Sequence, residues 1–256
     1  MKGLWSVYRK ELYILFASPI FYALALTFLI IAGYFFYNSV AYYNLLSFQA
    51  SQNPMLADQL NLGQMVLRPF FLDLGIVLLL VSPLITMRLY AEERKTGTIE
   101  LLFTYPLTDA ATLLAKFWAV LTALTFLLLG TIPGMLVLDR ILSINWSLVF
   151  SGYLGVLFLG GAFLSVGVFT SSLTQNQIIA GVISFGALLM LWIIGWARTM
   201  VGPEAAAVIA YLSITQHLDN FAKGVLDSRD VIYYLLFITF FLFLTLRQMV
   251  SYRWKG

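Results

Sequence analysis

Long apolar runs separated by short charged segments dominate the chain. Stretches without Asp, Glu, Lys or Arg cover Leu12–Ala57, Leu74–Met87, Phe117–Leu138, Ile141–Ala197 and Val231–Leu246. A helix needs roughly 20 residues to cross the hydrocarbon core of a bilayer. The pattern therefore predicts an all-α polytopic membrane protein with six transmembrane helices.

The longest apolar run is expected to supply two of these spans. Its polar stretch Thr170–Gln177 suits a tight turn between two helices. The six spans are expected near Ile20–Tyr37, Phe70–Leu89, Leu113–Leu138, Leu148–Thr170, Ile178–Trp196 and Val231–Met249. We interpret the chain, 1–256, as a single transmembrane domain.

Composition agrees with a membrane protein. Hydrophobic residues make up 61% of the chain and charged residues 11%, whereas a soluble domain carries about 25% charged residues. The chain has no cysteine, which excludes disulfides and thiolate metal sites. A signal peptide is the alternative interpretation of the first run, but about 18 apolar residues are too many for its core, and Glu11 is unusual there.

The distribution of basic residues predicts the orientation. With both termini in the cytoplasm, ten Lys and Arg residues lie in inner segments and five in outer ones. Because inner loops are enriched in Lys and Arg, this orientation is favoured. We expect a multi-pass protein of a bacterial or archaeal plasma membrane, the inner membrane where there are two.

The N-terminal segment, 1–18, has an amphipathic pattern. Its apolar side chains fall on one face of a helix and comprise Leu4, Trp5, Tyr8, Leu12, Leu15 and Phe16. This favours a helix that lies in the inner membrane interface. The alternative is a cytoplasmic extension of the first span, broken at Pro19.

The segment 91–106, between the second and third spans, combines charge with a short apolar face. Gly97 permits a sharp bend after the charged residues. Ile99, Leu102 and Phe103 share one face of a short helix that Pro106 ends. Thr108 or Asp109 can cap the next helix. Such a helix lies on the membrane or docks into another protein.

The outer segment, 197–230, precedes the last span and contains the only histidine, His217. Gly224 can end a short helix near Lys223, and Asp227 or Ser228 can start the last span. One or two short outer helices are expected here. His217 alone cannot form a metal site and is interpreted as a packed polar residue.

Signals of enzymatic activity are nearly absent. The sequence has no phosphate-binding loop with the pattern of an ATPase, no His-Glu-x-x-His and no Gly-x-Ser-x-Gly. No ionisable residue lies near the middle of a predicted span, which argues against a proton-coupled pump.

The fourth span is rich in Gly and Ser. Small residues let helices approach closely, so these residues serve packing either within the chain or at a subunit interface.

The stretch Ala91–Leu102, with Glu93, Gly97, Thr98 and Glu100, resembles the Glu-x-x-x-Gly-Thr-x-Glu signature of ABC-2 type permeases, the membrane subunits of type V ABC exporters. Pro106 and Lys116 also suit that pattern. Thr215–Asp230 is similar to the corresponding segment of gliding-motility-type (GldF-like) permeases. Span number and order agree over nearly the whole chain.

The resemblance implies a dimer of permeases, with the same chain or a related one, and two cytoplasmic ABC ATPase subunits. ATP and Mg²⁺ would then be bound by the ATPase, with no cofactor, metal or catalytic residue in this chain. An auxiliary membrane subunit and lipid are further expected partners, and nucleic acid is not.

The resemblance also implies roles for particular residues. The residues that would couple to the ATPase are Glu92, Glu93, Arg94, Gly97, Thr98, Ile99, Glu100, Leu102 and Phe103. Those of an outer gate are Tyr211, His217, Phe221 and Gly224. The expected function is export of an amphiphilic or polymeric substrate. The alternatives are a membrane scaffold that transmits mechanical signals without solute transport, and a membrane-embedded enzyme.

Overall fold

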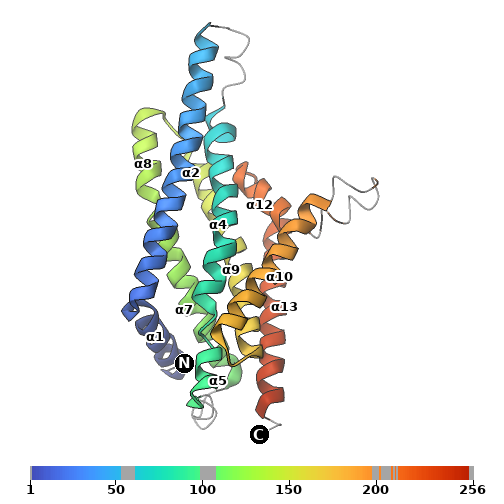
Figure 1. Cartoon of the computed structure of the whole chain (residues 1–256). Coiled ribbons are helices and arrows are strands. Elements are labelled where there is room, and N and C mark those ends of the chain that lie inside the picture. The colour runs from blue at the N-terminus through green and yellow to red at the C-terminus, as the bar shows by residue number, and fades with distance from the viewer. Residues whose placement is uncertain are drawn as a thin grey trace.

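The computed structural model describes residues 2–52, 61–98, 108–197, 202, 209, 211 and 213–253, and within them the regular structure is helical. Its helices are α1 (Lys2–Ala17), α2 (Pro19–Gln52), η1 (Gly63–Leu67), α4 (Arg68–Thr86), α5 (Ala91–Lys95), α7 (Asp109–Leu129), α8 (Ile132–Ile141), α9 (Trp146–Leu173), α10 (Gln177–Ala197), α12 (Ile214–Ala222) and α13 (Ser228–Arg253). They form an elongated bundle (Figure 1). We call the end where α1 begins and α13 ends the lower end.

Among the residues that the structure describes, six helical stretches are long and apolar enough to cross a membrane. They are Pro19–Gln52, Gly63–Lys95, Asp109–Ile141, Trp146–Leu173, Gln177–Gly195 and Ser228–Ser251. Each overlaps one of the predicted spans, so the prediction of an all-α polytopic membrane protein is confirmed.

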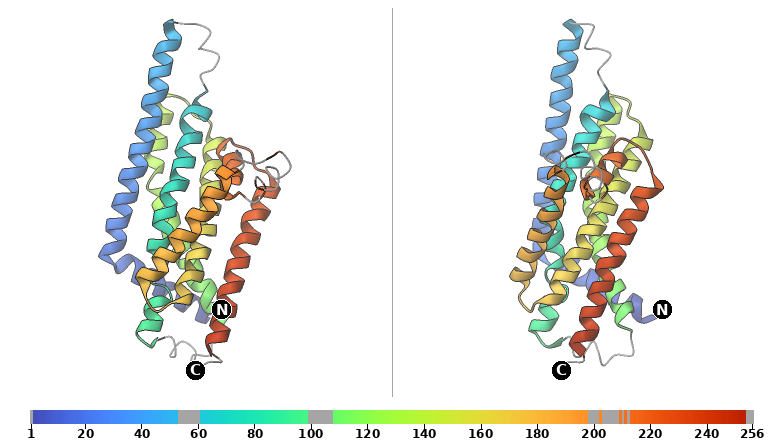
Figure 2. Two further views of the ribbon diagram at one scale, coloured as in Figure 1. Left: turned by 45° about the vertical axis from the view of Figure 1, so that its right-hand side comes forward. Right: turned by 90° about the vertical axis from the view of Figure 1, so that its right-hand side faces the viewer.

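The first span is much longer than predicted. Helix α2 continues to Gln52, so its 34 residues reach about 51 Å at 1.5 Å per residue. A bilayer core is about 30 Å thick. The upper part of α2 therefore rises beyond the other helices (Figures 1 and 2). Residues 38–52, which were expected in an outer connection, belong to this helix.

The third span is interrupted near its upper end. α7 ends at Leu129 and α8 begins at Ile132. Pro133 lies in the first turn of α8, where its missing N–H costs no hydrogen bond. The span was predicted as one uninterrupted helix, and Pro133 accounts for the break.

Helix α9 is the centre of the bundle, and α4, α7, α10, α12 and α13 pack around it. Its glycines permit close approach: a Cβ atom on Gly152 would overlap the ring of Phe71, and one on Gly160 would overlap Leu124. The small residues of the fourth span therefore serve packing within the chain.

Candidate functional site

A hydroxyl group on α9 anchors the start of α5 at the lower end. The Oγ of Ser171 accepts hydrogen bonds from the backbone N–H groups of Tyr90 (3.1 Å) and Ala91 (3.2 Å). The same hydroxyl donates to the Met87 carbonyl at 3.0 Å. Arg94 donates to the Ser172 carbonyl. The short helix is thus bound to α9 at both of its ends.

A buried ion cluster binds α5 to two further helices. The Nζ atom of Lys116 on α7 donates to Glu11 Oε1 at 2.8 Å, to Glu93 Oε1 at 2.9 Å and to the Leu89 carbonyl at 2.9 Å. The three donors of an ammonium group are therefore all used. Lys116 is fully buried. The cluster joins α1, α5 and α7.

Lys10 completes the charge balance at the edge of this cluster. Its Nζ atom lies 3.2 Å from Glu93 Oε1 and 3.5 Å from Glu11 Oε1. Burial lowers the pKa of Lys10, but the charges of Glu11 and Glu93 outweigh burial and leave the pKa above its ordinary value. Two lysines thus face two carboxylates.

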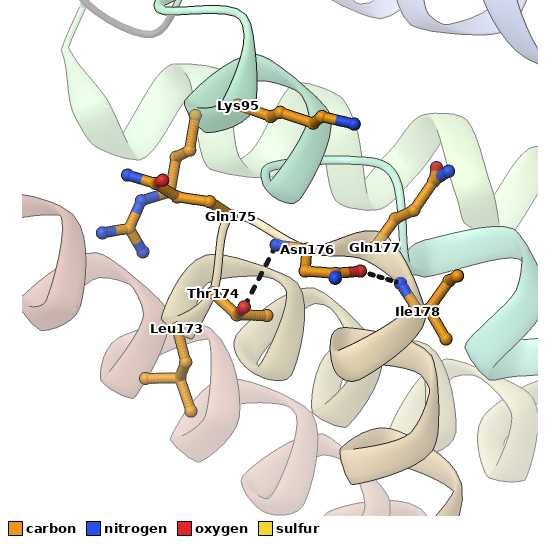
Figure 3. A pocket seen from close by; sticks show the side chains of 8 residues that line it. Lys95, Leu173, Thr174, Gln175, Asn176, Gln177 and Ile178 are labelled. Carbon is orange, nitrogen blue, oxygen red and sulfur yellow. Dashed lines mark hydrogen bonds between the residues drawn. The ribbon is translucent and has the colours of Figure 1, made fainter.

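Two cavities flank α5, and its charges are divided between them. One, of about 420 Å³, is lined by Glu92 and Glu93 together with residues of α1, α2 and α4. The other, of about 730 Å³, is lined by Arg94, Lys95 and the α9–α10 turn, 173–178 (Figure 3). The two acidic residues of α5 therefore face one cavity, which Lys10 and Arg88 also line, and its two basic residues face the other.

The chain turns sharply after α5, as the sequence predicts. Gly97 has a φ of 71°, in the left-handed region that favours glycine. Thr96 Oγ1 lies 2.9 Å from both Thr98 Oγ1 and the Glu92 carbonyl oxygen. The predicted coupling residues Ile99, Glu100, Leu102 and Phe103 lie outside the described residues. Thr108 precedes α7, and its side chain caps that helix by accepting a hydrogen bond from the Ala111 N–H.

The predicted gate residues occupy different environments at the upper end. On α12, Phe221 is fully buried and His217 is 5% exposed. Tyr211 is 64% exposed, and Gly224 has a φ of 83° just after α12. The gate residues of α12 thus point into the protein, where Phe221 packs closely against Gly155 of α9.

Asp219 attaches α12 to α4. It accepts from Arg68 Nε at 2.6 Å and pairs with Lys223 at 2.5 Å. Burial raises the pKa of the Asp219 carboxyl, but hydrogen bonds and charge from Arg68 and Lys223 outweigh burial and leave the pKa below its ordinary value.

His217 has partners that the sequence analysis did not identify. Its Nδ1 lies 2.5 Å from Asp230 Oδ1 and its Nε2 lies 3.0 Å from the Tyr211 carbonyl oxygen. Within the described ranges, no group of three or more His, Cys, Asp or Glu residues could hold a metal ion. The polar side chains at both ends join helices to one another.

Comparison of the sequence with known protein families gives a match over nearly the whole chain. Residues 5–247 match the family model of the ABC-2 family transporter protein. The chain belongs to the ABC-2 transporter family. A search of curated protein sequences gives no significant match. The predicted ABC-2 permease is confirmed: this is a membrane permease subunit of an ABC transporter, and membership implies pairing with a cytoplasmic ABC ATPase.

The contact between Glu11 and Lys116 was not predicted because the two residues are far apart in the sequence, whereas Glu93 was among the predicted coupling residues. Glu11 lies among the apolar residues of the N-terminal helix, and Lys116 lies two turns inside α7. A charge in such a position needs a partner. That signal could have paired the two residues before the fold was known.

Proposed function

We propose that this ABC-2 permease moves an amphiphilic or polymeric substrate outward, powered by a separate ATPase that docks at the lower, cytoplasmic end. The observation that carries the proposal is the attachment of α5 to three helices. Ser171 ties it to α9, and the Lys116 cluster ties it to α1 and α7. A displacement of the segment 91–106 would therefore move several spans together.

The charge pattern of α5 supports a docking role for this segment. Glu92 and Glu93 face one cavity, whereas Arg94 and Lys95 face the other. Charges at the rim of an interface set orientation, and buried apolar side chains supply most of the affinity. In this proposal Leu102 and Phe103 provide that apolar contact.

Affinity capture tests the docking role. The permease, solubilised from its native membrane, should bring down an ABC ATPase that mass spectrometry identifies. Leu102→Asp with Phe103→Asp should abolish capture while the permease stays folded. A matched control replaces Val225 and Leu226, which are exposed at the opposite end, by Asp and should retain the ATPase. Full capture by the first variant would refute docking through this face.

The helices support an amphiphile better than a small ion. The helices α2, α9 and α10 contain no Asp, Glu, Lys or Arg, and an unpaired ion at the centre of a membrane is costly. We place the pathway at the seam of a dimer, lined by α2, α4 and α10. With the ATPase in proteoliposomes, ATP should drive movement of a fluorescent phospholipid and no flux of sodium ions.

We further assign the permease to the gliding-motility-like (GldF-like) subgroup of the bacterial or archaeal plasma membrane, the inner membrane where there are two. The motif that supports this is Thr215–Asp230, which forms α12 and the start of α13. The partner would be a second copy or a related permease, with room for an auxiliary subunit. The identity of chains captured with the tagged permease tests this assignment.

A scaffold that transmits ATPase movement to an envelope machine is the second candidate. The same attachment of α5 to α1, α7 and α9 favours it, because the attachment transmits movement whether or not a solute crosses. ATPase stimulation without any phospholipid movement in the proteoliposomes would select this function over export.

A further inference from the structure

Both ring nitrogens of His217 face hydrogen-bond acceptors at the upper end. Nε2 lies 3.0 Å from the Tyr211 carbonyl oxygen, and Nδ1 lies 2.5 Å from Asp230 Oδ1. A carbonyl oxygen only accepts, so the contact with Tyr211 is a hydrogen bond in the tautomer that carries a hydrogen on Nε2. In that neutral tautomer, Nδ1 turns a lone pair toward a carboxylate oxygen of Asp230. Two acceptors at this distance repel each other, so holding both contacts at once requires one more proton between Nδ1 and Oδ1.

We propose that His217 and Asp230 form a proton-binding site, and that the bound proton clamps α12 to the first turn of α13. The surroundings favour a protonated imidazole beside an ionised carboxylate. Asp230 lies in the first turn of α13, where the helix dipole stabilises negative charge. Its second oxygen, Oδ2, accepts from Asn220 Nδ2 at 2.9 Å.

Burial makes the proton essential to the contact. His217 is 5% exposed and Asp230 is 3% exposed, so water has little access to replace a lost hydrogen bond. The ring also stacks on Tyr233, with 3.9 Å between the ring centroids. A protonated imidazole gains from an aromatic face, and a neutral ring gains less.

The other titratable groups around His217 do not replace this proton. Tyr233 and Tyr234 of α13, and Tyr211, place their rings against the imidazole, and Tyr234 donates its hydroxyl to the Ile214 carbonyl. On α12 itself, Asp219 is bound to Lys223 and to Arg68 of α4.

The remaining helices that pack against α12 add few ionisable groups. Helix α4 also carries Asp73, and α9 carries Tyr153 as its one titratable side chain. Helix α10 has none. Asp230 is therefore the carboxylate whose contact with His217 depends on the extra proton.

Loss of the proton should open this part of the structure. Nδ1 and Asp230 Oδ1 would separate, so α12 would lose one of its polar links to α13 and keep those of Asn220 to Asp230 and of Tyr234 to the Ile214 carbonyl. As the imidazole ring shifts, its hydrogen bond to the Tyr211 carbonyl would be displaced too. If the upper end is the exit of an exporter, the proton regulates that exit. This last step rests on the proposed function, whereas the proton-binding site itself does not.

Nuclear magnetic resonance on the full-length chain tests the site directly. His217 is the only histidine, so a purification tag without histidine and ¹⁵N-histidine labelling give signals from one ring. At pH 7 the ¹⁵N chemical shifts of both ring nitrogens should be those of protonated nitrogens. Alternatively, one nitrogen should have the shift of a protonated nitrogen while infrared spectra show a protonated Asp230 carboxyl group. A neutral ring beside an ionised Asp230 at pH 7 would overturn the proposal.

Thiol labelling in detergent tests the clamp. The protein has no native cysteine, and Ser213, at the start of α12, is 2% exposed. The rate of maleimide labelling of Ser213→Cys, divided by that of exposed Ser51→Cys, should rise about tenfold or more from pH 6 to pH 9, since buried thiols react only on opening. In His217→Gln and Asp230→Asn backgrounds this ratio should not change with pH.

The resonance and thiol-labelling measurements test the proton-binding site independently of the proposed export function. A ratio that is independent of pH in the native background would refute the clamp. Protonated nitrogens and a rising ratio, together with absent phospholipid movement in proteoliposomes, would sustain the proton site and refute export.

Discussion

The ammonium group of Lys116 on α7 lies 2.8 Å from the carboxylate of Glu11 on α1, with both side chains shielded from solvent. The two residues are 105 positions apart in sequence. Glu93 of α5 shares the same lysine at 2.9 Å. One buried cation thus fixes the N-terminal helix, the third span and the charged helix to one another.

Replacing Lys116 should therefore destabilise the permease strongly. Lys116→Met leaves two buried carboxylates without their main partner, a loss of roughly 3–5 kcal/mol. The midpoint of thermal unfolding in detergent should fall on the order of 10 °C.

Lys10 provides the matched control within the same cluster. Its side chain is 50% exposed, so Lys10→Met should cost at most about 1 kcal/mol. The triple variant Lys116→Met, Glu11→Gln and Glu93→Gln should recover part of the loss. Equal shifts for the two single lysine variants would contradict the central place of Lys116.

The link between Arg68 and Asp219 should weaken only in acid. The pKa of Asp219 is lowered from its ordinary value of 3.8, so the folded state favours the ionised carboxylate. That contribution is complete above the ordinary pKa and disappears as the pH falls through the lower pKa of the folded state.

The comparison of native protein with Asp219→Asn measures this link. The variant should be less stable by roughly 1 kcal/mol or less, because the ion pair is partly exposed. The difference in unfolding midpoint should stay constant from pH 8 to pH 5 and shrink below pH 4. A difference that stayed constant down to pH 2 would contradict this account of the link.

Close packing of α12 on α9 predicts a sharp contrast between two glycines. A Cβ atom on Gly155 would overlap the Cβ atom of Phe221, whereas Gly186 has nothing within 4 Å. Gly155→Ala should destabilise by about 1–3 kcal/mol through overpacking. Gly186→Ala should be neutral, or stabilising by up to about 1 kcal/mol through helix propensity. Unfolding midpoints in detergent give both values.

Periodicity and apolar length were sufficient to predict the six spans, because a bilayer imposes a minimum helix length. Turn chemistry was also local enough to predict: Gly97 and Gly224 adopt positive φ, and α1 ends next to Pro19. The upper half of α2 was missed because the predicted span was limited to the length that a bilayer core requires, whereas the helix continues beyond that length to Gln52.

Contacts between distant residues could not be predicted in this way. Glu11 and Lys116 meet only because α1 crosses α7, and His217 meets Asp230 only because α12 packs against the start of α13. From the sequence, His217 was expected to be a packed polar residue, and it is buried. No local pattern indicated its carboxylate partner. Tertiary packing decides such pairs.

The proposed orientation predicts which introduced cysteines react from outside intact cells. Lys95→Cys, on α5 at the lower end, should resist an impermeant maleimide, and Ser51→Cys, at the upper end of α2, should react. Lysis should make both reactive. Labelling of Lys95→Cys in intact cells would contradict the proposed orientation and indicate the opposite one.

The exposed apolar surface of α10 predicts where two permeases meet. Leu189 and Ile193 lie one helical turn apart and are 37% and 44% exposed. On α4, whose other residues are mostly buried, Ile76, Leu80 and Leu84 form an exposed stripe at the same spacing. Facing copies would cover both surfaces, as isologous dimers do. We therefore expect Leu189→Cys and Ile193→Cys to form disulfide-linked dimers on mild oxidation in membranes.

Lipid-facing positions supply the control for this experiment, because random collisions in a membrane also produce disulfides. Leu236 on α13 is 65% exposed, and α13 lies outside the proposed seam. Leu236→Cys should stay monomeric under oxidation that links the α10 variants. The fraction of each α10 variant that becomes linked should stay the same when the protein density in the membrane is lowered, because collisions then become rare. If cysteines along α2, α4 and α10 all fail to crosslink while the ATPase turns over normally, the seam cannot lie at these helices, and the pathway must be sought elsewhere on the bundle.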